Sequence, residues 1–354
     1  MIEELYALVL AGGRGARFWP LSRRARPKQC LSLGDGPAAI VSTIERLRPL
    51  IPVDRILVAT GREMESAVRA SLPDIPPENF IVEPWGRNTA PCIGLGAVEI
   101  GRRSPDAVMA VFPSDHQIDD DETLRSVVSG AAAAAKATNA FVTIGVEPTR
   151  PETGFGYVEV GPQMGEWGGH CFLKVSRFRE KPSIDLAREF VDSGQYLWNA
   201  GMFVFTVGAL KDALRRFLPR TSEALERVTQ NPDSLEDEWG NMDATSIDYG
   251  VMERSNAILT VRCDLGWRDL GTWSSAGETM PRHGAGRGVA AQVIAKDASN
   301  CVVYAPGKAV ALIGVEDLVV VDTEDALLVM QGDRSASVGE VVRDLESQGQ
   351  DGLT

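Results

Sequence analysis

The sequence has few of the side chains that bind soft metals. Only three of its 354 residues are histidines, and its five cysteines are scattered without a Cys-x-x-Cys pair: Cys30, Cys92, Cys171, Cys263 and Cys301. This pattern excludes a zinc or iron centre of the Cys/His type. It predicts reduced, mostly buried thiols instead of a disulfide framework. A bound metal would then be a hard cation, held by carboxylates and by the phosphates of a ligand.

Long hydrophobic runs are also missing. No apolar run reaches the ~18–20 residues that a membrane span requires. The N-terminal MIEELYALVLAGG places acidic residues before its apolar stretch, unlike a signal peptide. The formal net charge of −13 argues against a nucleic-acid partner, which would need a broad basic face. We therefore expect a cytoplasmic protein that binds neither nucleic acid nor membranes.

Carboxylates are absent from one segment of this acidic chain. Residues 5–34 contain no Asp or Glu but six cations: Arg14, Arg17, Arg23, Arg24, Arg26 and Lys28. The segment opens with an apolar run and continues with Gly12, Gly13 and Gly15. Glycine lets backbone N–H groups come close to anionic oxygens. The pattern therefore predicts a phosphate-binding loop directly after a strand.

The spacing of this loop excludes two common phosphate-binding motifs. Phe18 stands where a G-x-G-x-x-G dinucleotide fingerprint needs its last glycine, and no Gly-Lys pair follows at the spacing of a P-loop. The loop is therefore of a third kind, in which Arg17 and Lys28 add side-chain cations to the backbone. Surface charges are expected among the remaining cations Arg23, Arg24 and Arg26.

Short apolar runs alternate with amphipathic stretches over the first part of the chain. The pattern predicts strands at 5–10, 55–60, 80–83, 107–112 and 141–146, and helices at 39–50, 63–72, 90–103 and 122–138. Strands that are uninterrupted Val/Leu/Ile-rich runs indicate a parallel sheet covered on both faces. We therefore expect an α/β fold with a doubly wound, mostly parallel, Rossmann-like sheet. Ligands of such sheets bind at the carboxyl ends of the strands.

The pattern changes after Arg150. Strands are expected at 157–160, 172–178 and 202–207, with helices at 184–193, 208–217 and 246–253, which indicates a mixed region that covers a substrate. The stretch MPRHGAGRG, residues 280–288, is the expected linker. Short β runs broken by Gly and Asp turns follow it, and then a helix over 335–347. We therefore divide the chain into a main domain, 1–280, and a small β-rich C-terminal extension, 288–354, that could be a β-helix fragment with a final helix.

Separate motifs occur along the chain in a fixed order: LAGGRGARFWPLS with PKQ, EPWGRNTAP, FPSDH, TGFGYVE, FREKP, YLWNAGMFVF, SIDYGVME and GWRDLGTW. Together they closely resemble the sugar-1-phosphate nucleotidyltransferases, and within them the mannose-1-phosphate guanylyltransferases. The resemblance implies the nucleotide-diphospho-sugar transferase fold for the main domain. It also implies the reaction of GTP with mannose 1-phosphate to give GDP-mannose and pyrophosphate. Long bacterial members carry a further cupin-like isomerase module, which we expect this short form to lack.

The resemblance also implies roles for individual residues. Arg17 and Lys28 would hold the leaving pyrophosphate, and Lys181 would hold the phosphate of the sugar. Asp115 and Asp269 would be the ligands of Mg²⁺, which binds one or two carboxylates together with substrate phosphates. Read without the family, both aspartates would more often cap a turn or helix, and Lys181 would be a surface lysine at a strand end.

Base and sugar recognition are assigned to the remaining motif residues. The base would meet the loop around Gly12 and the run Arg87, Asn88 and Thr89, because an Asn amide offers both a donor and an acceptor to a purine edge. Asn88 could cap the following helix as well. The hydroxyls of the sugar would meet Glu180, Asn199, Asp248 and the backbone at Gly156.

Two alternatives to the guanylyltransferase remain, and one expectation concerns the assembly of the protein. The same enzyme class could use another nucleoside triphosphate or glucose 1-phosphate. A catalytically silent, nucleotide-sugar-binding regulator would be expected to have lost Arg17, Lys28 or one of the two aspartates, and all of them are present. A homodimer is consistent with a β-rich tail that could pair subunits.

Overall fold

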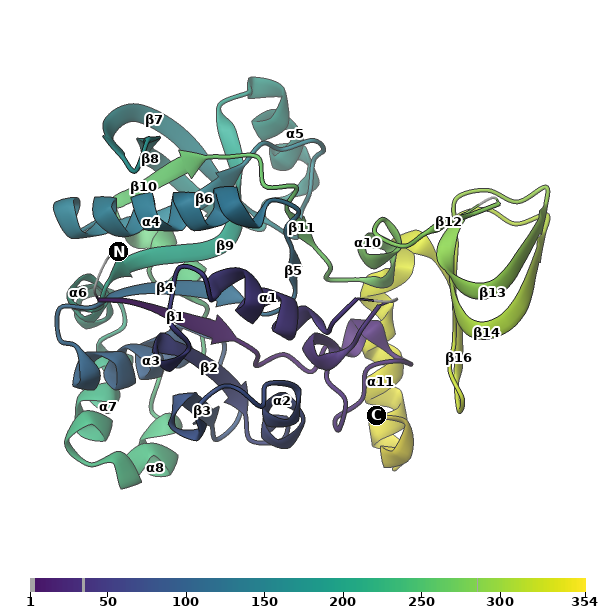
Figure 1. Cartoon of the computed structure of the whole chain (residues 1–354), viewed down its shortest axis with the longest axis horizontal. Coiled ribbons are helices and arrows are strands. Elements are labelled where there is room, and N and C mark those ends of the chain that lie inside the picture. Colours follow the sequence, from purple (N-terminus) through teal and green to yellow (C-terminus); the bar gives the residue numbers. More distant parts are fainter. Residues whose placement is uncertain (1–3, 34–35, 285) are drawn as a thin grey trace.

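The computed structural model describes residues 4–33, 36–284 and 286–354. Its main body is a nine-stranded sheet with the order β3-β2-β1-β4-β9-β6-β10-β8-β7. The strands are β1 Leu5–Leu10, β2 Ile56–Gly61, β3 Phe80–Glu83, β4 Val108–Pro113, β6 Phe141–Val146, β7 Gly156–Trp167, β8 His170–Glu180, β9 Tyr196–Thr206 and β10 Ile258–Arg262. Figure 1 shows this sheet at the centre of the main body.

The first half of the sheet is parallel. β1 lies between β2 and β4, and all three are buried apolar runs, as a sheet covered on both faces requires. The register pairs Leu10 with Pro113, so β1 and β4 end at the same edge of the sheet. The glycine-rich loop after β1 and the segment Ser114 to His116 after β4 are therefore neighbours.

The second half is mixed. β9 runs antiparallel between β4 and β6, β6 pairs parallel with β10, and β8 and β7 extend the sheet in antiparallel pairs. The strand expected at 202–207 begins earlier, at Tyr196. The sequence Asn-Ala-Gly at 199–201 resembles a turn, but in the structure it is part of the strand. Gly201 has a φ of +67° and the β6–β9 register shifts between Thr143 and Gly145, so the strand continues through a local irregularity in the ladder.

Helices cover both faces of the sheet. One apolar core contains side chains of α1 Ala39–Leu47, α2 Glu65–Ser71, α4 Asp121–Thr138 and α5 Ile184–Ser193. A second core contains side chains of α3 Thr89–Arg103, α6 Val207–Phe217, α7 Pro219–Gln230 and α9 Ile247–Gly250. The short helices α8 Leu235–Trp239 and α10 Trp273–Gly277 complete the main body. The doubly wound α/β architecture predicted from the sequence is confirmed.

The C-terminal extension is a five-stranded sheet and a helix. The sheet has the order β12-β13-β14-β15-β16, with β12 Arg282–His283, β13 Gly286–Lys296, β14 Cys301–Ile313, β15 Leu318–Asp322 and β16 Leu327–Gln331, and the helix is α11 Val338–Ser347. Figure 1 shows α11 against the N-terminal loop segment and the small sheet projecting beyond it. Much of the expected linker 280–288 is strand, and its residue 285 lies outside the described residues.

A third apolar core joins the extension to the part of the main body that carries the glycine-rich loop. Phe18 and Trp19 pack there with Trp273, and side chains from β15, β16 and α11 complete the cluster. The Trp19 indole donates a hydrogen bond to Leu353 O at 2.8 Å. The glycine-rich loop is therefore held partly by the C-terminal extension. In the part of the chain that the structure describes, no helix is both long enough and apolar enough to cross a membrane.

Candidate active site

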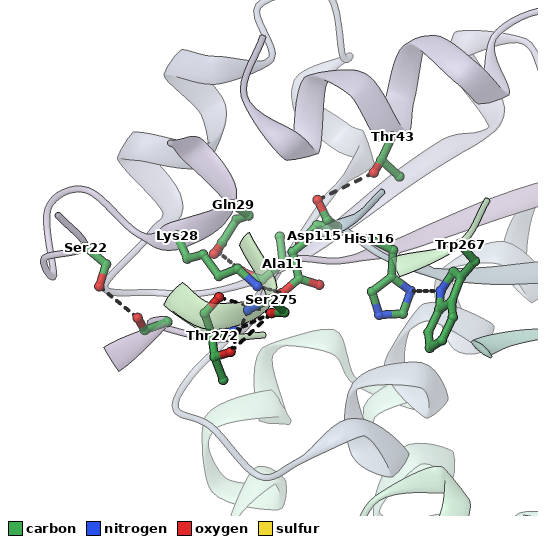
Figure 2. A network of polar contacts seen from close by, with 12 residues as sticks. Ala11, Ser22, Lys28, Gln29, Thr43, Asp115, His116, Trp267, Thr272 and Ser275 are labelled. Atoms are coloured by element: carbon green, nitrogen blue, oxygen red, sulfur yellow. Dashed lines mark hydrogen bonds and ion pairs between the residues drawn. The ribbon is translucent and has the colours of Figure 1, made fainter. Parts of the chain in front are cut away.

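The glycine-rich loop is held at both of its ends. Ala11 O accepts a hydrogen bond from Gln29 Nε2 at 2.8 Å, and Ser22 Oγ donates to Gly15 O at 2.8 Å (Figure 2). Ala11 O also accepts a hydrogen bond from Thr60 Oγ1 at 3.2 Å. Gly15 has a φ of +69°, and a Cβ on it would lie 2.2 Å from Lys28 Cβ. Glycine is therefore required at position 15 both for the backbone conformation and for the space that Lys28 occupies.

Lys28 connects this loop to the end of β4. Its ammonium group donates to Asp115 Oδ2 at 2.7 Å and lies 4.7 Å from the centre of the Phe18 ring, and the side chain is buried (Figure 2). Burial alone would raise the pKa of Asp115. The charge and hydrogen bond of Lys28, together with the adjacent His116, outweigh burial and keep that pKa below its usual range. Asp115 is therefore a carboxylate at neutral pH.

The other cations of the loop differ in their surroundings. Arg17 is exposed and forms no side-chain hydrogen bond or ion pair within the described residues, so it is available to a ligand. Three arginines instead pair with acidic residues: Arg14 with Glu63 and Glu346, Arg23 with Asp325, and Arg24 with Glu346 and Asp351. Most of these acidic partners belong to the C-terminal extension. Composition alone could not distinguish Arg17, which is available to a ligand, from the arginines that form ion pairs.

A two-stranded ribbon contains one candidate metal ligand, Asp269, and begins directly after the other, Asp115. β5 His116–Gln117 pairs antiparallel with β11 Arg268–Asp269, and Asp269 lies opposite His116. Asp115 directly precedes β5, one residue away from the position opposite Asp269. No group of three or more His, Cys, Asp or Glu suited to a metal occurs among the described residues. Two carboxylates leave the other coordination positions to substrate and water, as Mg²⁺ sites commonly do.

A cavity of about 440 Å³ runs along the carboxyl edge of the sheet. Most of the sequence-predicted residues line it: Gly12, Gly13, Asn88, Thr89, Gly156, Glu180, Asn199, Asp248 and Asp269. Lys28 and Asp115 line a second cavity of about 280 Å³. Gly15, Arg17, Arg87 and Lys181 line neither. His116 lines both and so lies at their junction.

The sugar-site candidates form a row across three strands. Gly156 of β7 lies opposite Glu180 of β8 on one side and opposite Asn199 of β9 on the other. A Cβ on Gly156 would lie 2.6 Å from Glu180 Oε2, so a larger residue would displace that carboxyl group. Asn199 Nδ2 donates to Asp248 Oδ1 at 3.2 Å, and Asn199 Oδ1 accepts from Thr143 Oγ1 at 2.6 Å. The amide is therefore oriented by its neighbours.

Glu180 is a buried carboxyl group in which only one of the two oxygens has a partner within the described residues. Oε1 pairs with Lys181 Nζ at 3.2 Å, whereas Oε2 is buried without a hydrogen-bond partner in the described part of the chain. Burial raises the pKa of Glu180 to about 7, the charge of Asp248 adds to this rise, and Lys181 opposes it. Burial also raises the pKa of Asp248. An unpaired buried acceptor at a cavity wall is suited to a ligand hydroxyl.

The run Arg87, Asn88 and Thr89 makes structural contacts. Arg87 Nη2 donates to Met242 O, and Thr89 Oγ1 accepts from Ile247 N at 2.9 Å, which ties this run to α9 and to the loop before it. Asn88 has a φ of +71°, and its Oδ1 accepts from Thr89 N at 2.9 Å as the N-cap of α3. Asn88 and Thr89 also line the cavity, so their structural contacts and a place beside the base coexist.

Glu83 was not among the residues expected from the sequence. It ends β3, is only 4% exposed, and lines the cavity beside Gly12, whose added Cβ would lie 3.8 Å from Glu83 Oε2. Burial raises the pKa of its carboxyl group, and a hydrogen bond with Cys92 partly opposes this. The sequence feature that could have identified Glu83 is an acidic residue at the end of an apolar strand, directly before Pro84. A buried carboxyl group there is costly unless a partner binds it.

A doubly wound sheet with a cationic glycine loop and a polar cavity at the carboxyl edge of its strands is typical of α/β enzymes that bind phosphorylated ligands. The family model described as nucleotidyl transferase matches residues 6–284. A second model, described as MannoseP isomerase/GMP-like beta-helix domain, matches residues 291–345.

Known proteins resemble the chain over almost its whole length. It is 36% identical to the xanthan biosynthesis protein XanB of Xanthomonas campestris pv. campestris (strain B100), covering 100% of this chain and 76% of that protein. It is 36% identical to a mannose-1-phosphate guanylyltransferase of Escherichia coli (strain K12), covering 98% and 74%. A crystal structure described as mannose-1-phosphate geranyltransferase from Thermus thermophilus superimposes with a TM-score of 0.87 at 38% identity, covering 97% and 99%. The chain therefore belongs to the nucleotidyl transferase family, in its mannose-1-phosphate guanylyltransferase branch.

Proposed function

We propose that this protein transfers GMP from GTP to mannose 1-phosphate, giving GDP-mannose and pyrophosphate. The observation that carries the proposal is the arrangement of one sheet edge. The cationic glycine loop, the Glu83 carboxyl group and the row of Gly156, Glu180 and Asn199 all lie along it. That order is suited to a triphosphate, a base and a sugar bound side by side.

The reaction joins two anions. A phosphate oxygen of mannose 1-phosphate attacks the α-phosphorus of GTP, the bond from that phosphorus to the bridging oxygen breaks, and pyrophosphate leaves with the electron pair. Such transfers depend on positioning and on charge neutralisation more than on an acid or base. Arg17 and Lys28 hold the leaving pyrophosphate, and Lys181 holds the sugar phosphate. A hydrogen bond to a charged group of this type contributes ~1.5–3 kcal/mol.

Members of the nucleotidyl transferase family usually use a divalent metal. We propose that the metal here is Mg²⁺ and that Asp115 and Asp269 hold it. What supports this is the β5–β11 ribbon, which places Asp269 opposite the residue next to Asp115, and the low pKa that keeps Asp115 ionised. When bound, the ion would neutralise phosphate charge. Lys28 orients Asp115 through the 2.7 Å hydrogen bond.

Base selection is assigned to Glu83. Guanine carries two adjacent donors, the N1–H and the 2-amino group, and a carboxylate can accept from both. Adenine and the pyrimidines do not present that pair. The exposed backbone at Gly12 lies beside the same carboxyl group. Glu83→Gln replaces one acceptor oxygen by a donor, so we expect the preference for GTP over the other triphosphates to fall about tenfold or more.

A pyrophosphate-release assay tests the proposal and its alternatives. GTP, UTP, ATP and CTP are each paired with mannose 1-phosphate and with glucose 1-phosphate, with and without Mg²⁺. The highest kcat/KM is expected for GTP with mannose 1-phosphate. A different best pair would support the alternative substrates, and no release with any pair would support the silent regulator.

Two arginines of the same loop provide a matched comparison for that assay. Arg17→Ala is expected to lower kcat/KM by about tenfold to a hundredfold without changing the melting temperature, because Arg17 has no protein partner within the described residues. Arg26 is also exposed and forms no side-chain hydrogen bond or ion pair within the described residues, so Arg26→Ala should leave both quantities close to wild type. Equal effects of the two changes would refute a specific role for Arg17.

Location, assembly and domain division remain proposals as well. We propose a cytoplasmic enzyme, supported by five cysteines that are all free thiols. We also propose a homodimer paired through the C-terminal extension, supported by its exposed apolar side chains Ile294, Ile313 and Val329. Light scattering measures the mass directly, and a monomer at micromolar concentration would refute the dimer. We place the boundary between main domain and extension at 280–288.

A further inference from the structure

His116 lies where the two cavities meet, and the reaction described above leaves it without a role. It lines the larger cavity together with Gly13 and Asn199, and the smaller one together with Lys28 and Asp115. Figure 2 shows its ring beside Asp115, with Trp267 at one ring edge. A polar ring at this junction is placed where the phosphates of two substrates would meet.

The hydrogen bond from Trp267 determines which ring nitrogen of neutral His116 carries the proton. Trp267 Nε1 lies 3.1 Å from His116 Nδ1. An indole N–H can only donate, so Nδ1 must be the acceptor and carry no proton. The proton of the neutral ring is therefore on Nε2. Nε2 makes no hydrogen bond within the described part of the chain.

Both partners of this hydrogen bond are held firmly. The two rings meet edge to face, with centroids 5.4 Å apart and planes at 86°, and Trp267 also packs against Phe155 at 5.1 Å. The backbone of His116 is fixed by its pairing with Asp269 and by Arg46 Nη1, which donates to His116 O at 3.2 Å. A donor held in this way loses little conformational entropy when a ligand binds.

We propose that His116 is a substrate-binding donor whose Nε2–H binds a phosphate oxygen where GTP and mannose 1-phosphate meet, and that Trp267 is the positioning residue that keeps the proton on Nε2. This proposal rests on the proposed function for the identity of the two substrates. The phosphate is either the α-phosphate of GTP or the phosphate of the sugar, because His116 borders both parts of the site. A neutral N–H donor complements the charged donors Lys28 and Arg17, which hold the leaving group.

The tautomer can be measured without any activity assay. The chain contains three histidines, so ¹⁵N-histidine labelling gives three imidazole signals, with His170 and His283 as internal references. The free wild-type protein near pH 8 is expected to show His116 as the Nε2–H tautomer. Trp267→Phe keeps an aromatic ring but removes the donor, so a mixture of tautomers is expected. An Nδ1–H tautomer in the wild type would overturn the proposal.

Ligand titrations of the same sample identify the phosphate. A shift of the His116 signal with GTP alone would point to the α-phosphate, and a shift with mannose 1-phosphate alone would point to the sugar phosphate. Either result supports the proposal. A shift with free mannose of the same size as with mannose 1-phosphate would overturn the phosphate assignment, and so would no shift with either substrate.

Kinetics of three variants separate a donor from a merely structural ring. His116→Phe keeps a planar ring and removes the donor, and it is expected to lower kcat by about tenfold to a hundredfold. His116→Gln offers an amide N–H, so part of this loss should be restored. Trp267→Phe should lower kcat less than His116→Phe does. Equal losses in His116→Gln and His116→Phe would overturn the donor role.

The outcomes also distinguish this proposal from the proposed function. If no substrate pair releases pyrophosphate but GTP still shifts the His116 signal, the proposed function fails and the phosphate contact stands. If the wild type turns over GTP and mannose 1-phosphate while the His116 signal stays unchanged, the contact fails and the function stands.

Discussion

Position 28 shows how one side chain links several parts of the site. The Lys28 ammonium group is buried, donates to Asp115, and packs over Phe18, while its Cβ occupies the space left by the missing side chain of Gly15. A buried ammonium group is stable only with a partner of opposite charge. Lys28 therefore depends on Asp115, and the glycine loop depends on Lys28.

Gly15→Ala is expected to destabilise the protein. A Cβ at this position would lie 2.2 Å from Lys28 Cβ, and the left-handed backbone would add a cost of about 1–2 kcal/mol for a residue other than glycine. We expect a lower free energy of unfolding in urea and a loss of activity, because Lys28 must move. Gly13→Ala is the matched control, since a Cβ there meets nothing within 4 Å and stability should be unchanged. A fully stable, active Gly15→Ala protein would contradict this account.

Glu180 makes stability depend on pH in a defined direction. Its pKa is about 7 in the folded protein, against an ordinary value of 4.5, so the folded state holds a proton more tightly than the unfolded state does. The stability that this proton contributes is fully present below the ordinary pKa and is lost as pH rises through about 7. One pKa unit corresponds to ~1.4 kcal/mol, so the contribution amounts to about 3 kcal/mol at most.

Glu180→Gln removes this titration and tests it. The free energy of unfolding of the wild type minus that of the variant should fall by about 1–3 kcal/mol between roughly pH 5 and pH 8. Denaturant unfolding of both proteins across this range gives the difference directly. Glu166→Gln, at an exposed position of β7 in the same sheet, is the matched control for the substitution itself. A difference for Glu180→Gln that is independent of pH would refute the raised pKa.

At the scale of elements, short segments at strand ends position the site. β5 and β11 are only two residues long, yet their pairing brings Asp269 opposite His116. The row of Gly156, Glu180 and Asn199 depends likewise on the register of three antiparallel strands. A shift of one residue would turn each of these side chains to the other face of the sheet.

The N-cap of α3 allows structural and functional roles to be separated. Asn88→Gly keeps the positive φ but removes the side-chain cap, so the free energy of unfolding should fall by a few tenths to about 1 kcal/mol. Asn88→Ala also forces the backbone to change and should cost more. If Asn88 contacts the base as well, KM for GTP will rise in both variants, and KM for mannose 1-phosphate will not. An unchanged KM for GTP would leave Asn88 with the capping role alone.

At the scale of the whole molecule, the third apolar core joins the two ends of the chain. Phe18 of the glycine loop and Trp273 of α10 pack 5.0 Å apart, and strands of the extension complete the cluster. The ion pairs of Arg14 and Arg24 with Glu346 of α11 lie over the same junction. The extension therefore supports the glycine loop, although it contributes no residue to the 440 Å³ cavity at the carboxyl edge of the sheet.

Substitutions of two adjacent leucines in β16 test whether the C-terminal extension supports the glycine loop. Leu328 is 8% exposed and belongs to the third core, whereas Leu327 is 60% exposed. Leu328→Ala should lower the free energy of unfolding by about 2–5 kcal/mol and accelerate hydrogen exchange in residues 12–18 as well as in β16. Leu327→Ala should change neither by a measurable amount. Unchanged exchange in the glycine loop of the Leu328→Ala protein would show that the extension does not hold the loop.

Local patterns in the sequence predicted most of the parallel half of the sheet. β1, β3 and β6 match the predicted bounds, and β2 and β4 are each shifted by one residue, because each is an apolar run with turn residues on both sides. The antiparallel half of the sheet was predicted less completely. β10 was missed although ILTVR is a short, mostly buried apolar run. The first part of β9, α7 and α8 were missed because glycine-containing or polar stretches there obtain their structure from tertiary packing.

The sequence by itself determined the fold class and the family, because periodicity and ordered motifs are properties of neighbouring residues. Only the tertiary structure decided which groups face one cavity. Glu83 and the His116–Trp267 hydrogen bond, between residues 151 apart in the chain, could not be read from local patterns. Contacts of this kind arise from strand register and helix packing. These bring together residues that are far apart in the chain, and no local sequence pattern shows that such residues will be in contact.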